Sequence, residues 1–444
     1  MPLLSNMPPA RIDAVMQHPA HRKTVESLPG FISDLRMCQN PADFVAFQQN
    51  LLSATLTATQ ARAERSRVAK RLRKKEKLPP DAPELHEGNP HDVDVWALEL
   101  DVYERVIRQL RSIGDALAWR VLGYNRSYIL ALCRNESPGP MHLDKKGTQH
   151  EIEFTAEQWR DHRRFTLLHD LTDCLRIGDA TVFHDGDDGW QYIYLHELKS
   201  NPNARDRVQD LRLKAAAEAT QNFGRLPGDI RARLVDTGVP YATHLPALAD
   251  ALSLAHQRGI QTMKIPGGRA LLAFDFSAAR NRWGEEEAAR RFESAYSSVL
   301  RRARLTTGTR ICFSSGDSVA RGRLTPPWGI YPLQPAQCAA LIADFLVFTV
   351  TLRSDSLVEE LGKCGMDARW LLPDGVEPTS PGQPVLELRS NGHRVSMNSA
   401  EINRLLLELV DLPTWARGMD RVLAKGTVGW QPWPVFTNED QIWI

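Results

Sequence analysis

The sequence predicts a multidomain α+β protein with an all-helical N-terminal region, a small α/β core and a mixed α+β C-terminal region. Three observations predict this class: a long helical run without Gly or Pro after Pro41, a hairpin turn near residue 187, and turn-bounded strands interleaved with helical segments after residue 230. The chain has 444 residues, whereas one domain takes about 150. We expect three regions, 1–140, 141–230 and 231–444.

Two long helices are predicted in the N-terminal region. Asn40 followed by Pro41, with Asp43 in the first turn, is typical of a helix start, and the next Gly or Pro is Pro79. A second helix is predicted from apolar residues spaced three and four apart, and we expect it to end near Gly114. These apolar residues are Trp96, Leu100, Tyr103, Ile107 and Leu110.

The second half of the first long helix is strongly basic. Residues 61–77 contain nine Lys or Arg against two Glu. Such an arm can lie along a nucleic-acid backbone, where each neutralised phosphate releases counterions. It can equally be a solvated helix end whose cations complement the helix dipole, and the sequence leaves both readings open.

The middle region is predicted to be a helix, a hairpin and a second helix. Thr155 with Gln158 three residues later has the spacing of a capping box, and an apolar face is supplied by Phe165, Leu168, Leu171 and Leu175. Residues 185–189, Asp-Gly-Asp-Asp-Gly, are typical of a tight turn, which predicts paired strands on either side. The second helix is expected from about Asp206 to Phe223.

The C-terminal region is predicted to contain two further hairpins. They are residues 260–276 around Pro-Gly-Gly and residues 384–398 around Asn391-Gly392. Helices are expected at about 285–304, 335–352 and 400–409.

The middle hairpin brings charged residues to one end of its sheet. A turn centred near residue 187 or 188 places Asp179 opposite His196 or Glu197. Glu197 and Lys199 share one face of their strand, because side chains alternate along a strand. Two carboxylates side by side are costly unless a cation joins them, and Mg²⁺ takes one or two carboxylates and leaves room for water and phosphate. This arrangement fits hydrolysis of a phosphodiester.

Residues 150–223 resemble the PD-(D/E)xK nuclease superfamily, whose members have the restriction-endonuclease-like fold. The resemblance rests on Gly178-Asp179, on Glu197-Leu198-Lys199 after the hydrophobic run 192–195, and on a following helix with Gln209 and Arg212. It implies that Asp179, Glu197 and the carbonyl of Leu198 bind Mg²⁺ or Mn²⁺. It also implies that Lys199 acts on the reacting water and phosphate and that Gln209 supports the site and contacts substrate. Gly178 stands where the family often has Pro.

The family frequently adds an acidic residue from the helix before the hairpin. Glu157 is the preferred candidate for this further metal ligand, with Asp170 and Asp173 as alternatives. Some exonuclease-like branches use a His instead, for which His169 or His162 is available.

The function expected from these residues is a metal-dependent nuclease acting on DNA, with RNA as the alternative substrate. A role in bacterial defence or in a mobile element would suit such an enzyme. The rival hypothesis is a non-catalytic nucleic-acid-binding or assembly protein that keeps the nuclease fold. In the simplest alternative, Glu197 and Lys199 only form an exposed cross-strand ion pair. A homo-oligomer or a protein partner stays open.

Composition excludes few classes of function. The 55 Lys and Arg nearly balance the 54 Asp and Glu, so global charge does not decide whether nucleic acid is a partner. No apolar run approaches the ~20 residues of a membrane helix, and no secretion signal is recognised, so we expect a cytoplasmic protein without membrane contact. The six Cys are scattered without zinc-site spacing. No GxxxxGK[ST] phosphate loop is present, which argues against an ATP-driven activity.

Overall fold

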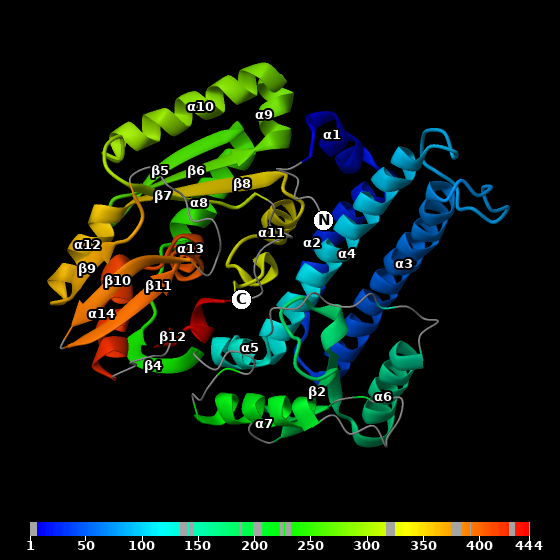
Figure 1. Cartoon of the computed structure of the whole chain (residues 1–444), viewed down its shortest axis with the longest axis horizontal. Helices are drawn as coiled ribbons and strands as arrows, with labels where there is room; N and C mark the ends of the chain where they lie inside the picture. Colours follow the sequence, from blue (N-terminus) through cyan, green and yellow to red (C-terminus); the bar gives the residue numbers. More distant parts are fainter. Residues whose placement is uncertain are drawn as a thin grey trace. The chain divides into compact units, whose positions relative to one another are not determined.

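The computed structural model shows a mixed α+β protein, a helical N-terminal region followed by several small sheets with helices (Figure 1). It describes residues 7–133, 141, 146–186, 189–196, 198, 207–222, 226, 232–316, 325–373, 383–390, 392–425 and 431–443. The chain forms two compact units. The first comprises Met1–Gly123, Leu132–Ala217 and Asp317–Tyr331, and the second Tyr124–Ala131, Glu218–Gly316 and Pro332–Ile444. The predicted boundary near residue 140 therefore lies inside the first unit.

The first unit begins with four helices, and the two longest lie side by side (Figure 1). They are α1 (Pro9–Gln17), α2 (Pro19–Met37), α3 (Pro41–Arg73) and α4 (Val93–Val121). The predicted start of α3 is confirmed, because Asn40 and Asp43 form a capping box. The Asp43 N–H donates to Asn40 Oδ1 at 3.1 Å, and the Asn40 N–H donates to Asp43 Oδ2 at 3.3 Å.

The predicted end of α4 near Gly114 is wrong, since the helix continues to Val121. Gly114 serves close packing. A Cβ added there would lie 1.9 Å from the carbonyl oxygen of Leu171. One Gly inside a helix costs only about 1 kcal/mol, which the buried face of α4 readily offsets.

The prediction for residues 155–175 is also wrong. The helix there, α6 (Lys146–His162), begins before Thr155, whose hydroxyl donates to the carbonyl of Ile152 at 2.8 Å. It is followed by the strand β1 (Phe165–Leu168) and the short helix η2 (His169–Leu171). All four residues of β1 are buried. A short apolar run that is buried on both faces does not distinguish strand from helix by periodicity alone.

The predicted hairpin is confirmed as β2 (Ala180–Gly186) and β3 (Gly189–His196), which with β1 form an antiparallel sheet of order β1-β2-β3. Ala180 pairs with His196, and the register shifts by one residue between Val182 and Phe183. Both predicted registers therefore occur, one on each side of this irregularity. The helix α7 (Arg207–Asn222) follows, close to its predicted bounds.

The second unit contains a four-stranded antiparallel sheet of order β5-β6-β8-β7. Its strands are β5 (Ile260–Ile265), β6 (Arg269–Asp275), β7 (Arg310–Ser314) and β8 (Leu346–Arg353), and the helices in this part are α8 (Leu245–Arg258), α9 (Phe276–Trp283), α10 (Glu285–Arg302) and α11 (Pro335–Ile342). The hairpin on Pro-Gly-Gly and the helix α10 confirm the prediction. The predicted helix at 335–352 is wrong in its second half, because the chain turns at Asp344, with φ of 59°, into the buried strand β8.

The rest of the second unit consists of two small sheets and four helices. The β9-β10-β11 sheet is antiparallel and the β4-β12 pair is parallel. The strands are β4 (Ala232–Pro240), β9 (Asp367–Trp370), β10 (Pro384–Ser390), β11 (His393–Asn398) and β12 (Gln431–Thr437), and the helices are α5 (Arg126–Leu132), α12 (Ser354–Lys363), α13 (Ser399–Leu407) and α14 (Leu412–Ala424). The β10-β11 hairpin and α13 confirm their predictions. Within the described residues, no helix combines the length and apolar character that crossing a membrane requires.

Candidate active site

Asp179 stands directly before β2, and the chain on both sides fixes its backbone. Its N–H donates to the carbonyl of His196 at 2.8 Å, and its carbonyl accepts from the N–H of His169 at 3.0 Å. The end of β3 and the start of η2 therefore hold this residue from two sides.

The carboxylate of Asp179 is held by the residue between the predicted Glu and Lys of the motif. The N–H of Leu198 donates to Asp179 Oδ2 at 2.6 Å. Leu198 is buried, so little water competes for this charge-assisted hydrogen bond. Two of the predicted site residues, Asp179 and Leu198, are thus in direct contact.

His169 supports the segment that carries Asp179. Its Nδ1 is 2.9 Å from the carbonyl of Gly178, and its Nε2 is 2.7 Å from the hydroxyl of Thr181. Because the carbonyl can only accept, Nδ1 carries the proton and Nε2 accepts from the hydroxyl. Burial and then the nearby Arg176 lower the pKa of His169 to about 3. His169 is therefore a neutral residue that positions the start of β2.

Gly178 has a backbone conformation that Pro cannot adopt. Its φ is +74°, and a Cβ there would lie 3.1 Å from the carbonyl oxygen of His196 and 3.3 Å from Leu213 on α7. Since the proline ring fixes φ near −65°, the chain enters this site in a different conformation from a Pro-Asp sequence.

A second carboxylate, Glu151 on α6, is close enough to Asp179 to be affected by its charge. Glu151 is buried, and its pKa is raised from 4.5 to about 8 by burial first, then by Asp170 and Asp179. Its Oε2 has no hydrogen-bond partner among the residues that the structure describes. Glu151 therefore keeps a proton near neutral pH unless a cation is close by.

These groups fit a hard cation but do not form a closed ligand set. Nowhere in the described ranges do three or more His, Cys, Asp or Glu side chains cluster with metal-binding geometry. Mg²⁺ needs only one or two carboxylates and keeps several waters. Asp179, and Glu151 with its unpartnered oxygen, can supply these carboxylates.

The other predicted residues are placed as follows. Glu197 and Lys199 lie outside the described residues, and Gln209 lies in α7 with a side chain outside the described part. Glu157 is exposed on α6, and six residues of helix rotate it by about 240° from Glu151. It therefore lies on a different side of α6 from Glu151.

Of the alternatives to Glu157, the two Asp lie close to Arg side chains and His162 is exposed. Asp173 lies 3.9 Å from Arg111 and 4.0 Å from Arg176, and Asp170 lies 3.8 Å from Arg176. His162 is exposed at the end of α6. Of these three residues, Asp170 is the one that acts on Glu151.

Sequence reasoning missed Glu151, although a signal for it exists. The inward face of α6 follows Thr148, Glu151, Thr155 and Gln158 at spacings of three and four. Glu151 is the acid in this series. Choosing it required knowing that α6 starts at Lys146 and not at Thr155.

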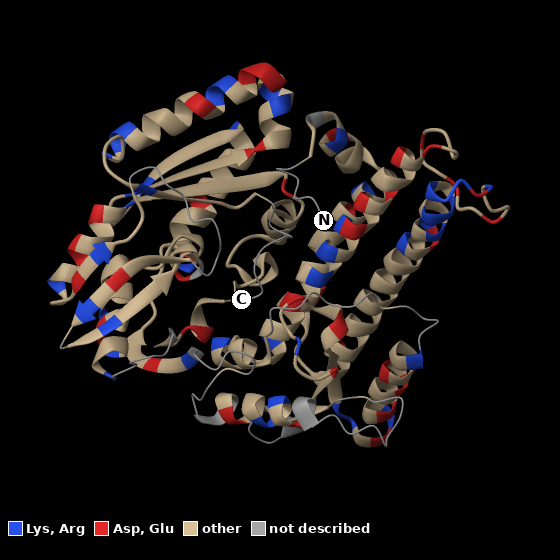
Figure 2. Cartoon of the chain, in the orientation of Figure 1, with Lys and Arg blue, Asp and Glu red and all other residues tan. Residues whose placement is uncertain are grey.

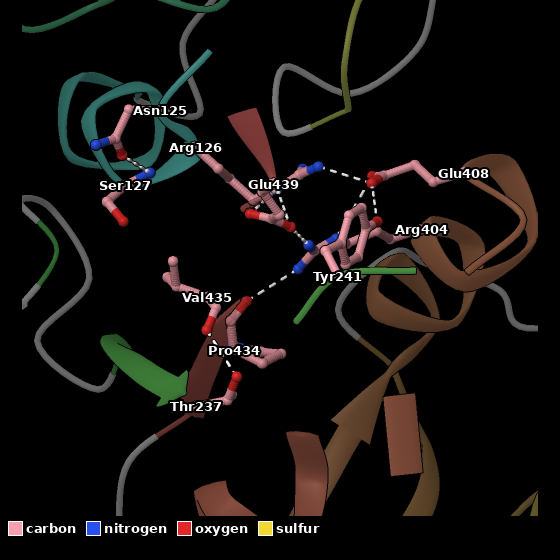
Figure 3. A network of polar contacts seen from close by, with 10 residues as sticks. All are labelled: Asn125, Arg126, Ser127, Thr237, Tyr241, Arg404, Glu408, Pro434, Val435 and Glu439. Carbon is pink, nitrogen blue, oxygen red and sulfur yellow. Dashed lines mark hydrogen bonds and ion pairs between the residues drawn. The ribbon is translucent and has the colours of Figure 1, made fainter. Parts of the chain in front are cut away.

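A second cluster of charged groups lies inside the second unit (Figure 3). Arg126 Nη2 is 2.7 Å from Glu408 Oε2, and Arg126 Nε is 3.2 Å from Glu439 Oε1. Arg404 pairs with Glu439 and donates to the carbonyl of Pro434 at 3.0 Å. The Tyr241 hydroxyl donates to Glu408.

This cluster is structural. Each of its four charged side chains is less than 10% exposed, and two Arg balance two Glu. Burial and the neighbouring Glu408 raise the pKa of Tyr241 well above its usual value. The cluster joins residues from four separate parts of the chain, near residues 126, 241, 404–408 and 434–439, so local sequence patterns do not predict it.

Comparison with known protein families, curated proteins and solved structures finds no match to this chain.

Proposed function

We propose that this chain is a metal-dependent nuclease of the PD-(D/E)xK type that hydrolyses phosphodiester bonds in DNA. Its core would span α6 to α7, with Asp179, Glu197 and the Leu198 carbonyl as ligands of Mg²⁺ or Mn²⁺. The observation that carries the proposal is the Asp179 carboxylate held by Leu198 N–H at 2.6 Å. It supports the predicted meeting of the Asp with the Glu-x-Lys segment.

The bound metal would lower the pKa of a coordinated water and neutralise charge on the phosphate. Asp179 contributes a fixed carboxylate. Its backbone is hydrogen-bonded to His169 and His196, and its carboxylate accepts from the N–H of Leu198. Glu151 contributes a second acid that gives up its proton when positive charge arrives. Lys199 is proposed to act on the attacking water or on the phosphate.

The test is cleavage of plasmid, linear duplex, single-stranded DNA and RNA by purified protein in Mg²⁺ or Mn²⁺, with chelator as the blank. We expect DNA to be cut with metal and spared by an Asp179→Asn variant. If none of the substrates is cut, the proposal fails. Binding without cleavage would instead support a nucleic-acid-binding or assembly protein that keeps the fold.

A further inference from the structure

The helix α3 connects the candidate active site to the basic arm in one uninterrupted element of 33 residues. Its first half packs on β1. The side chain of Gln48 donates from Nε2 to the carbonyl of Thr166 at 2.8 Å and accepts from the N–H of Leu168 at 3.1 Å. Leu168 pairs with Ala180, the residue after Asp179. Gln48 therefore marks a point where α3 contacts the strand beside the site, and Leu52 and Leu56 of α3 pack on the same part of the chain.

The second half of α3 is fixed to α4. Arg65 Nε lies 2.5 Å from Glu99 Oε2, and the Arg65 guanidinium lies 4.3 Å from the ring centre of Tyr103. Arg62 pairs with Glu104 at 2.7 Å. Val68 and Ala69 are buried against Trp96. Two of the nine basic residues are thus engaged with α4, and the helix is supported to its last turn.

Four other basic residues form an exposed face at the end of α3, which we call the arm face: Arg67, Lys70 and Arg71 within the helix and Lys74 at its C-cap. Spacings of three, four and seven place them on one side of the helix. Figure 2 shows Lys and Arg concentrated at this end of α3. The acids beside them are Glu76, 3.3 Å from Arg71, and Glu64, three residues before Arg67. The arm face therefore keeps a net positive charge.

The helix dipole favours Lys70, Arg71 and Lys74, which lie in or just after the last turn of α3, but it does not account for Arg67. Its attraction for cations falls off within the last turn, whereas Arg67 lies six residues before the end of α3 at Arg73. The exposed positions between Gln48 and the arm include Gln49, Asn50, Ser53 and Thr57, which carry no charge. An anionic strand lying along α3 therefore meets one acid over this stretch, the half-buried Glu64, which accepts a hydrogen bond from Gln60 Nε2 at 2.8 Å.

The spacing along α3 matches a DNA duplex. At 1.5 Å per residue, Gln48 is separated from Arg67 by about 28 Å and from Lys74 by about 39 Å. One turn of B-form DNA is about 34 Å, so its phosphates return to the same side after that distance. We infer that α3 holds duplex DNA about one helical turn from the scissile bond through the arm face. This inference rests on the proposed nuclease function.

The experiment measures binding in chelator, so that cleavage plays no part. The full chain is titrated with labelled DNA duplexes of about 10 and about 24 base pairs over a range of salt concentrations. Three proteins are compared: the parent, an arm variant with Arg67, Lys70, Arg71 and Lys74 changed to Ala, and a control variant with Arg290, Arg291, Arg301 and Arg302 of α10 changed to Ala. The control variant also loses four positive charges, but from exposed positions on α10.

We expect the arm variant to bind the longer duplex about tenfold more weakly, with a salt slope lower by about 3.6, since each of the four lost phosphate contacts removes about 0.9. The shorter duplex should lose less than about twofold, and the control should match the parent. An unchanged salt slope, equal losses on both duplexes, a parent that binds neither, or tighter binding of duplex RNA would overturn the inference. Arm-dependent binding without metal-dependent cleavage would count against the proposed function alone.

Discussion

The backbone N–H of Leu198 donates a hydrogen bond to the carboxylate of Asp179, with 2.6 Å between N and Oδ2. The contact joins the start of β2 to the segment after β3, which places the predicted metal-binding acid against the Glu-x-Lys sequence. Its donor belongs to the backbone, so substitution of side chains in the motif leaves it in place. The role of Asp179 in stability can therefore be separated from its proposed role in metal binding.

We predict that Asp179→Asn loses Mn²⁺ binding while keeping the fold. Asn retains a side-chain oxygen that can accept from Leu198, whereas Ala leaves the N–H of a buried residue without this acceptor. Asp179→Ala should lower the free energy of unfolding by about 1–3 kcal/mol, and Asp179→Asn by less. Calorimetric Mn²⁺ titration and urea denaturation measure the two effects.

The control is Glu157→Gln, which changes an exposed acid on a different side of α6 from Glu151. It should bind Mn²⁺ like the parent. Equal Mn²⁺ affinity of Asp179→Asn and the parent would remove Asp179 from the set of metal ligands.

Gly178→Ala should destabilise the protein more than Gly123→Ala. Both glycines have positive φ, +74° and +64°, so both variants carry the left-handed strain of about 1–2 kcal/mol. Only at Gly178 does the added Cβ come within 4 Å of other atoms, the nearest being the His196 oxygen at 3.1 Å. Urea denaturation compares the two, and equal losses would show that the crowding at Gly178 is relieved without cost.

Elements with a strong local signal could be predicted from the sequence. The capping box of Asn40 and Asp43, the Pro-Gly-Gly turn and the turn before Gly189 each specify a conformation within a few residues. The strands β1 and β8 could not, because their apolar residues are buried by distant segments and also fit a helix. Gly114 shows the same limit, since its contact is the carbonyl of Leu171, far along the chain.

In the candidate site, too, some features follow from a local sequence signal and others depend on distant contacts. The hairpin centre was enough to bring Asp179 to the segment after His196, because pairing about a turn fixes which residues oppose each other. Glu151 could not be chosen, since its approach depends on how α6 rotates against the sheet. The support from His169 comes from two contacts that only the folded chain creates.

The buried cluster of the second unit should respond to charge imbalance. Arg126→Met leaves two Glu facing one Arg in the protein interior, and should lower the free energy of unfolding by about 3–5 kcal/mol. Adding Glu439→Gln restores the balance, so the double variant should be less destabilised than the sum of the single changes by more than about 1 kcal/mol. Urea denaturation of the four proteins gives this coupling.

The matched control for that cycle is Arg291→Met. Arg291 is exposed and lies 2.7 Å from Glu287 on the surface of α10, so its loss should cost less than about 1 kcal/mol. Additive effects of Arg126 and Glu439 would contradict a shared buried network.

Glu151 should make stability depend on pH when metal is absent. Its pKa is about 8 in the folded chain against a usual 4.5, so between these values the folded state binds a proton that the unfolded state has released. The free energy of unfolding should therefore fall as the pH rises from about 5 to 8, by at most about 1.4 kcal/mol per pH unit.

Glu151→Gln should remove this slope, whereas Glu153→Gln, exposed on the same helix, should keep it. Urea denaturation in chelator across this range is the measurement. If the Glu151→Gln variant keeps the slope of the parent, another group holds the proton; if Mn²⁺ raises the stability of the parent at pH 8 more than that of Glu151→Gln, the Glu151 carboxylate contributes to cation binding.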